Sequence, residues 1–535
     1  MIRALAAAGL TAGLVAASAG VAGAVQPPVV PGGPAPADPA PGPDQPMRQI
    51  AACTATGVLP GSDLRELPPA LQLLDMPAAW RESTGVGVLV AVIDTGVAAQ
   101  PRLAHLVSGG DYVMGPYGDG LSDCDGHGTV VASLIGASPS GPPLAPEPAW
   151  ALPAVPPTGA PRPEPIPPPA PPPTVTVTQT TTISAPPAPP APPPPEEEAP
   201  AWALGRGIPT PLEPPPVGGP DGLVGVAPDA VLVSIRQTAQ TFGLVDPGVS
   251  ENPEDVRRAG DINSLARAIV HAANLGAKVI NISVVSCVPV TKQADQAGLG
   301  AAVRYAAVDK DVVIVAAAGN AGAQGCAQNP DPSPADFDRG WGLVKTVATP
   351  AWFSDYVLAV SATDSAGVPA SGQAASLHGP WIGLAAPGAD IVGLSTSGQV
   401  INGAVNEDKL HPIAGSSFSA ALVGGVAALV RAKFPELSAH QVIHRLQATA
   451  RPPAGGRDNV VGYGVVDPAA ALTWDVPAGD VLAPGVVRAP LRLPAPAPAA
   501  NRWPRRVAVV ISGVAVVGVL GLAIGLTVTR RRRQI

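Results

Sequence analysis

Short, continuous apolar runs recur along this chain and predict strands that are buried on both faces of a sheet. The runs lie at residues 86–93, 231–235, 278–282, 312–317 and 356–360. Continuous apolar character is typical of strands in a parallel sheet, because helices cover both faces of such a sheet. We therefore expect these runs to form one parallel sheet.

The segments between and after these runs show helical character. Apolar residues from Ile262 to Ala273 repeat at i, i+3, i+4, i+7, i+8 and i+11, and further helices fit residues 299–308 and 418–433. Because strands and helices alternate along the chain, the pattern predicts an α/β fold in which a parallel sheet is flanked by helices.

Proline marks the parts of the chain that fall outside this alternation. Many of the 70 prolines lie in an insertion at 138–222, and proline is dense again at 490–504. This composition favours extended polyproline conformations and buries too little apolar surface to fold, so we expect a disordered, Pro-rich inserted loop within one domain. We expect a second, shorter polar and proline-containing insertion at 323–350.

These features divide the chain into three parts between its ends. We expect an N-terminal extension at 25–80, a main domain at 81–475 and a Pro-rich stalk at 476–506. The extension is too proline-rich at 27–46 to fold alone. It therefore leaves little chain for an independently folded inhibitory pro-domain.

Both ends of the chain carry apolar segments that indicate export and membrane anchoring. Residues 1–24 have a basic start, an apolar run and small residues before a cleavage site, as in a secretory signal peptide. Residues 507–529 carry no charge and are long enough to cross a hydrocarbon core of ~30 Å once, as a transmembrane helix. We therefore expect a single-pass protein of the cell membrane, with its main domain on the extracytoplasmic side and a cytoplasmic tail at 530–535.

Cysteine usage agrees with export. The chain has Cys53, Cys124, Cys287 and Cys326, an even number that we expect to pair in an oxidising compartment. Of the three possible connectivities we favour the sequential one, Cys53 with Cys124 and Cys287 with Cys326. A metal site is disfavoured because no Cys-x-x-Cys or Cys/His pair has ligand spacing.

The charged residues argue against two classes of ligand. The net charge of −8 and only 32 Lys and Arg argue against nucleic-acid binding, which needs clustered cations; the one dense basic cluster, Arg530 to Arg533, has another explanation as the flank of the expected span. The acidic residues are scattered and form no Asp-x-Asp-x-Asp loop, so we expect no essential metal and no cofactor.

Three short motifs carry the candidate chemistry. Asp94 ends the first apolar run, His127 lies in Asp-Gly-His-Gly-Thr at the start of an apolar helical stretch, and Ser417 precedes the helix at 418–433. A serine hydroxyl becomes a nucleophile when an imidazole takes its proton, and a carboxylate fixes the tautomer of that imidazole. Asp94, His127 and Ser417 supply these three roles, which predicts peptide-bond hydrolysis.

A fourth residue strengthens this hypothesis. Asn320 follows the run at 312–317, where its side-chain amide and the backbone N–H of Ser417 can stabilise a developing oxyanion, a contact worth ~3 kcal/mol of barrier. Two alternatives are weaker. A Gly-Ser-Ser sequence is often an ordinary turn, and Asp-Thr-Gly is also an aspartic-protease motif, but that class needs a second such carboxylate and an all-β fold.

These motifs resemble the successive blocks of the subtilases, across about residues 85–472. The signal peptide, single span and paired cysteines, with two further motifs, resemble one branch of that family, the mycosins of type VII (ESX) secretion systems. The resemblance rests on Asp94-Thr-Gly, His127-Gly-Thr, Asn281-Ile-Ser283, Gly319-Asn320, Ala386-Pro-Gly388 and Gly415-Ser-Ser417, with Arg236-Gln237 and Gly462-Tyr-Gly-Val-Val-Asp467 for the branch.

The resemblance implies a subtilisin-like fold with a seven-stranded parallel sheet. It also implies a membrane-anchored serine endopeptidase that cleaves exported protein substrates and works with the type VII secretion membrane complex. An alternative is that the protein mainly stabilises that complex and that catalysis is dispensable for secretion. A cell-wall adhesin that displays the Pro-rich loop is a third possibility, based on composition alone.

One departure from the family pattern concerns substrate selection. The substrate-binding strand of subtilases commonly has the sequence Ser-Leu-Gly-Gly, whereas this chain has Ser283, Val284, Val285 and Ser286. Because Val285 replaces a glycine at the wall of the specificity pocket, we expect a small residue such as Ala before the scissile bond. We also expect the Cys53–Cys124 bond to hold the extension beside His127, so that the enzyme needs no removal of a pro-domain.

Overall fold

The structure is a computed structural model of the 535-residue chain. It describes residues 25–34, 36–140, 219–246, 253–292, 294–323, 325–333, 340–406, 408–483, 518–522 and 524–526. The chain divides into two compact units, Met1–Val486 and Val487–Ile535. The first unit holds every element named below.

A seven-stranded sheet of parallel strands forms the centre of this unit, which confirms the α/β fold and the expected strand number. All five apolar runs lie in it. The runs at 86–93, 231–235 and 278–282 are three neighbouring strands. In order across the sheet, the strands are β12 (Ile382–Pro387), β11 (Val357–Thr363), β9 (Val313–Ala317), β7 (Val279–Ile282), β3 (Leu89–Asp94), β5 (Val231–Arg236) and β4 (Leu106–Asp111).

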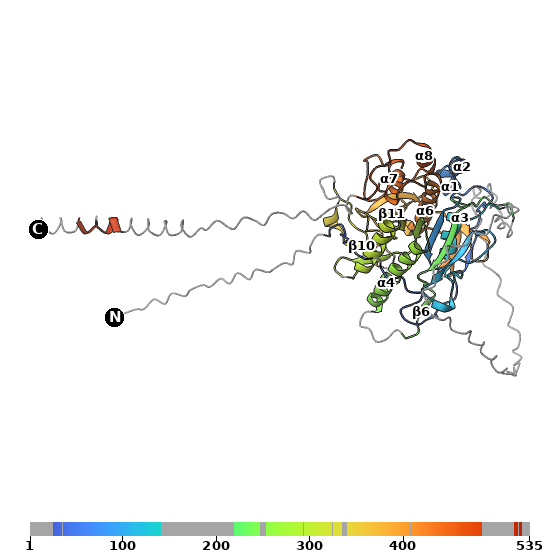
Figure 1. Cartoon of the computed structure of the whole chain (residues 1–535), viewed down its shortest axis with the longest axis horizontal. Helices are drawn as coiled ribbons and strands as arrows, with labels where there is room; N and C mark the ends of the chain where they lie inside the picture. The colour runs from blue at the N-terminus through green and yellow to red at the C-terminus, as the bar shows by residue number, and fades with distance from the viewer. Residues whose placement is uncertain are drawn as a thin grey trace, which may run out of the picture. The chain divides into compact units, whose positions relative to one another are not determined.

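Helices cover both faces of the sheet (Figure 1). Successive residues of β3 point to opposite faces, and all of them except the first, Leu89, are buried: Val90 and Val92 join one hydrophobic core, and Ala91 and Ile93 join the other. The helices are α1 (Pro69–Leu73), α2 (Met76–Trp80), α3 (His127–Gly136), α4 (Pro253–Asn274), α5 (Ala297–Arg304), α6 (Ser416–Lys433), α7 (Ala439–Ala448) and α8 (Pro468–Thr473).

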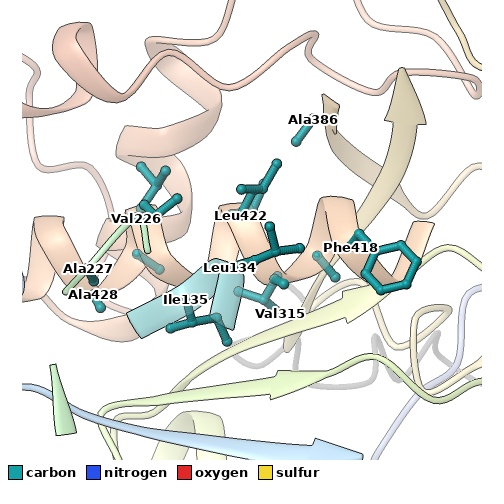
Figure 2. Packing of buried hydrophobic residues seen from close by; sticks show 14 of the residues in the cluster. Leu134, Ile135, Val226, Ala227, Val315, Ala386, Phe418, Leu422 and Ala428 are labelled. Atoms are coloured by element: carbon teal, nitrogen blue, oxygen red, sulfur yellow. The ribbon is translucent and has the colours of Figure 1, made fainter. Parts of the chain in front are cut away.

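Helix α6 is the central element of the first core. Most of its residues are buried, and it packs on strands β7, β9, β11 and β12 and on helix α3. Figure 2 shows Leu422 of α6, Leu134 of α3 and Val315 of β9 in this core. Helix α6 is rich in alanine and glycine because the sheet approaches it closely; for example, a Cβ at Gly424 would lie 3.0 Å from Oδ1 of Asn281 in β7. The start of α6, which carries Ser417, is therefore held firmly.

Short antiparallel pairs surround the main sheet. The pairs are β1 (Met47–Gln49) with β6 (Phe242–Leu244), β8 (Ser286–Pro289) with β10 (Thr346–Thr349), β13 (Gly393–Leu394) with β14 (Val400–Ile401), and β15 (Gly403–Asn406) with both β16 (Lys409–Pro412) and β2 (Thr56–Gly57). Strand β10 corrects one expectation, because the end of the supposed insertion at 323–350 is a buried strand. Strand β10 is defined by its backbone pairing with β8, and a run of only four residues is too short to indicate such a strand in the sequence.

The N-terminal extension lies along the surface of the main domain at several points. Its strands β1 and β2 pair with β6 and β15, and Asp38 contacts His271 and Asn274 of α4. Cys53 is bonded to Cys124, and the backbone N–H of Thr54 donates to the carbonyl of Cys124 at 2.9 Å. Where the structure describes the extension, its buried apolar side chains, such as Leu71, Leu74 and Met76, belong to the first hydrophobic core of the main domain.

Several predicted segments lie wholly or mostly outside the described residues. These are the signal peptide at 1–24, the inserted loop except for its ends, the stalk beyond residue 483 and the tail at 530–535. Of the expected span at 507–529, the structure describes helical residues at 518–522 and 524–526. Within the described part of the chain, no helix is long and apolar enough to cross a membrane.

Candidate active site

The side chains of Asp94 and His127 meet where β3 ends and α3 begins. Oδ1 of Asp94 lies 2.7 Å from Nδ1 of His127 and also accepts the backbone N–H of Thr95 at 2.7 Å. The Asp94 side chain is fully buried, whereas that of His127 is 30% exposed. Because an ionised carboxylate can only accept, Nδ1 of His127 carries the proton and Nε2 is left as the basic nitrogen.

Nearby negative charges favour the protonated form of His127. Burial lowers its pKa, but the charge of Asp94 and the hydrogen bond to it outweigh burial, with further help from the charges of Asp123 and Asp125. The pKa of His127 therefore lies above the ordinary histidine value. A histidine with a raised pKa is a stronger base, which is what deprotonation of a serine requires.

Ser417 is the second residue of α6, on the same side of the sheet as His127. The ring of the next residue, Phe418, lies 5.1 Å from the His127 ring, centroid to centroid. The Ser417 hydroxyl donates to the carbonyl oxygen of Ser283 at 2.9 Å, and the Ser283 hydroxyl donates back to the Ser417 carbonyl at 2.8 Å. This reciprocal pair joins the end of β7 to the start of α6, so the backbone that carries Ser417 is fixed while its hydroxyl can turn.

Asn320 follows β9 and faces the start of α6. Its Oδ1 accepts both the backbone N–H and the hydroxyl of Ser416, at 2.9 and 3.0 Å. These two donors identify the oxygen end of the amide, so Nδ2 points the other way, and it lies 3.0 Å from where a Cβ on Gly415 would be. The backbone N–H of Ser417, in the first turn of α6, has no carbonyl to bond within the helix.

Val285 lies beside the loop that precedes Asn320. A Cβ on Gly319 would lie 3.5 Å from Cγ1 of Val285 and 3.6 Å from Sγ of Cys287. Gly319 has a φ of +89°, a conformation that favours glycine. Val285 and Gly319 are thus neighbours, and Val284 and Val285 are half-buried.

The second disulfide links the segment after Val285 to the segment after Asn320. Cys287 of β8 is bonded to Cys326, in the segment that follows Asn320. Together with the Cys53–Cys124 bond this is the sequential pairing. The Cα atoms are 4.5 Å apart in the first bond and 5.1 Å apart in the second, within the usual range for a disulfide.

The sequence analysis did not single out Asp123. This residue is buried, and its carboxylate lies between Thr95, which follows Asp94, and the first turn of α3, which His127 begins. Asp usually caps a helix from the position directly before it, which is Gly126 here, so the capping pattern does not reveal Asp123.

Comparison with known proteins identifies the family. The model of the subtilase family matches residues 213–464, which include Asn281, Asn320 and Ser417. Mycosin-5 of Mycobacterium tuberculosis is 50% identical over 549 residues, which cover 96% of this chain and 93% of that protein. The chain belongs to the mycosins. As a mycosin it is a subtilisin-like serine endopeptidase.

Solved structures agree with this assignment. The mycosin described here is 42% identical to the MycP3 protease from the type VII (ESX-3) secretion system, with a TM-score of 0.66 over 84% of this chain and all of that one. A chain of an intact ESX-5 inner membrane complex is 46% identical, with a TM-score of 0.68 over 94% of this chain and all of that one.

Proposed function

We propose that Asp94, His127 and Ser417 are the catalytic triad of this endopeptidase and that Asn320 and the Ser417 N–H form its oxyanion hole. The observation that carries the proposal is the 2.7 Å contact between Asp94 Oδ1 and His127 Nδ1, made where the His127 ring lies 5.1 Å from the ring of Phe418, the residue after Ser417. Each side chain projects from the carboxyl edge of the sheet or from a helix start beside it, where ligands of parallel sheets bind.

The proposed reaction follows from these positions. The Ser417 hydroxyl turns from the Ser283 carbonyl toward His127, which takes its proton at Nε2 while Ser417 Oγ attacks the peptide carbonyl. The Asn320 amide and the Ser417 N–H stabilise the oxyanion. His127 then returns the proton to the leaving amine, the C–N bond breaks, and water hydrolyses the ester on Ser417 by the same route in reverse.

We propose that this enzyme prefers a small residue before the scissile bond. In this proposal Ser283, Val284 and Val285 line one side of the substrate site, and Val285 lies close enough to Gly319 that a Cβ there would be in van der Waals contact with Cγ1 of Val285. A branched side chain at this point reduces the space for a large side chain of the substrate. The proposal therefore rests on the position of Val285 relative to Gly319.

We propose that the extension remains attached in the active enzyme. Cys53 is bonded to Cys124, three residues before His127, and the extension pairs with β6 and β15 rather than folding as a separate unit. Labelling of the uncut chain by an active-site probe would support this role. Labelling only of molecules cut between residues 25 and 80 would contradict it.

We propose that the protein acts at the cell membrane with a type VII secretion complex. The support is its likeness to a chain of the ESX-5 inner membrane complex and to a protease of the ESX-3 system. In this proposal residues 1–24 direct export, the stalk at 476–506 connects the protease to a span at 507–529, and the protease cleaves exported proteins on the extracytoplasmic side.

A serine-reactive fluorophosphonate probe tests the triad directly. In the full chain, Ser417 Oγ should attack the phosphorus, fluoride should leave, and His127 should take the serine proton. We expect the wild-type chain to be labelled and Ser417→Ala to be unlabelled, whereas Ser416→Ala should retain labelling. Equal labelling of wild type and Ser417→Ala would overturn the assignment.

The same variant separates proteolysis from support of the secretion complex. If Ser417→Ala is present in cells at the normal level, stops substrate cleavage and leaves secretion intact, the two roles are distinct. If secretion is lost while the variant protein persists, catalysis is the essential role.

A further inference from the structure

Asp123 is a buried carboxylate that receives four hydrogen bonds. Its Oδ1 accepts the Thr95 hydroxyl at 2.9 Å and the Gly126 N–H at 2.8 Å. Its Oδ2 accepts the N–H and the hydroxyl of Thr129, at 2.8 and 2.7 Å. Four donors directed at one carboxyl group match its ionised form, because a protonated carboxyl would present a donor to one of them.

These bonds join the two segments that carry Asp94 and His127. Thr95 directly follows Asp94, and its hydroxyl accepts the Gly128 N–H at 2.9 Å while it donates to Asp123. A hydroxyl has one proton, so the acceptor at Asp123 sets its direction and leaves its lone pair for Gly128, the residue after His127. A single carboxylate therefore determines how the end of β3 meets the start of α3.

We propose that Asp123 is a positioning residue that holds Asp94 and His127 in catalytic register through Thr95 and the first turn of α3. The inference rests on the proposed triad, but it goes beyond the triad because Asp123 touches neither the nucleophile nor the imidazole in any contact described above. Its effect on the reaction passes through the geometry of the pair and through its charge.

The surroundings of Asp123 make that role dependent on pH. Burial raises the pKa of Asp123 to about 6, and the charge of Asp94 acts in the same direction, while hydrogen bonds from Thr129 and Thr95 oppose the shift. The titratable groups around it are Asp94, His127 and Asp125. At acid pH, protonation of His127 removes the general base. Protonation of Asp123 weakens the hydrogen bonds that position Asp94 and His127.

The variant Asp123→Asn tests the proposal in the full chain. An amide in place of the carboxylate directs an NH₂ group at one pair of donors, so we expect the maximal rate of labelling by the fluorophosphonate to fall roughly 10- to 100-fold. The probe concentration for half-maximal rate should change less than about twofold, because the binding surface is intact.

The pH profile separates positioning from a merely structural role. Protonation of His127 removes the base, and protonation of Asp123 lowers the rate about as much as Asp123→Asn does, so the logarithm of the wild-type labelling rate should fall with a slope that approaches two over about one to two pH units below pH about 6. In Asp123→Asn the slope should be one, and the acid limb should move to lower pH because His127 has lost a nearby negative charge.

Asp125→Asn is the matched control, since it removes an equal charge at a similar distance along the chain from His127. Asp125 accepts the backbone N–H groups of Gln240 and Thr241 and does not contact Thr95 or α3 in the hydrogen bonds described by the structure. We expect this variant to move the acid limb in the same direction while it keeps the maximal rate and the slope of two.

Two variants of Thr95 test the same hydrogen bond from its other side, in case Asp123→Asn does not fold. Thr95→Val removes the hydroxyl and should lower the maximal rate as Asp123→Asn does, and Thr95→Ser should restore it. Thermal unfolding shows whether each variant is folded.

The outcomes are distinct. Folded Asp123→Asn or Thr95→Val with wild-type rate and slope would overturn the inference. If Ser417→Ala is also labelled like wild type, the proposed triad itself fails.

Discussion

The side-chain oxygen of Asn320 accepts hydrogen bonds from both the N–H and the hydroxyl of Ser416, the residue before the proposed nucleophile. One end of the amide is therefore committed to holding the start of α6. The other end, Nδ2, is left to donate. This division of one side chain between structure and chemistry allows the two functions to be tested separately.

Asn320→Asp keeps the acceptor for Ser416 and removes the donor. We expect kcat to fall about 10²- to 10³-fold with KM nearly unchanged, because an oxyanion is stabilised only in the transition state. The melting temperature should stay near that of the wild type. Asn320→Ala, the control, should lose similar activity and also some stability; a fully active Asn320→Asp would exclude Asn320 from the oxyanion hole.

Val285→Gly should widen the specificity pocket. We expect the ratio of kcat/KM for substrates with Phe to those with Ala before the scissile bond to rise about 10- to 100-fold, since a few methylene groups in a pocket contribute about 1–3 kcal/mol. A peptide library profiled with both enzymes measures this ratio. Val288→Ala, in the same strand region but fully buried in the second core, is the control and should leave the ratio unchanged.

The pH dependence of the wild-type rate should report the base. His127 must be neutral to accept a proton, and Asp94 raises its pKa, so kcat/KM should increase with pH through a value above that of an ordinary histidine. Asp94→Asn should shift this acid limb to lower pH and reduce kcat about 10⁴-fold through loss of the correct tautomer. If the acid limb stays at the same pH in Asp94→Asn, a group other than His127 controls the pH dependence of the rate.

The Cys53–Cys124 bond should stabilise the extension without being required for chemistry. Replacing both cysteines by serine should lower the free energy of unfolding by about 2–4 kcal/mol, measured in denaturant, and should make the extension more sensitive to limited proteolysis. Probe labelling should persist. The matched double variant at Cys287 and Cys326 should instead alter substrate preference, because that bond braces the Gly319 wall.

Arg102 should hold the two ends of the inserted loop together. It donates to the carbonyls of Ser138 and Leu223 and pairs with Asp221 at 2.7 Å, and the Ser140 hydroxyl donates to the Asp221 carbonyl. Arg102→Ala should destabilise the domain by about 3 kcal/mol because it leaves a nearly buried carboxylate without its partner.

Excision of residues 141–218 is the complementary experiment. Replacing them with a short Gly-Ser linker shortens the closed loop, which should stabilise the fold by up to about 2 kcal/mol through a lower entropy of loop closure. Thermal unfolding of both variants measures the contrast. A large loss of stability on excision would contradict the prediction that Arg102 holds the two ends of the loop together without residues 141–218.

The sequence by itself determined the apolar interior of this protein and indicated its candidate reactive groups. The continuous apolar runs at 86–93, 231–235, 278–282, 312–317 and 356–360 all became central or near-central strands, because a strand buried on both faces must be apolar throughout. Asp94, His127, Ser417 and Asn320 were recognisable because their chemistry depends on residue type and on their places at strand ends and helix starts.

Only the tertiary structure decided the sheet edges, the register and the connections around the site. Strand β4 contains Ser108-Gly-Gly and shifts register against β5, so it lacks the apolar run of an inner strand, and β12 is a short run of mostly small residues that ends in Pro387; pairing with one neighbour in the sheet defines each. The role of Asp123 depends in the same way on Thr95 and Thr129, which the fold brings to it. Hydrogen bonds between segments distant in sequence leave no periodic pattern, so they emerge only when the strands and helices are packed.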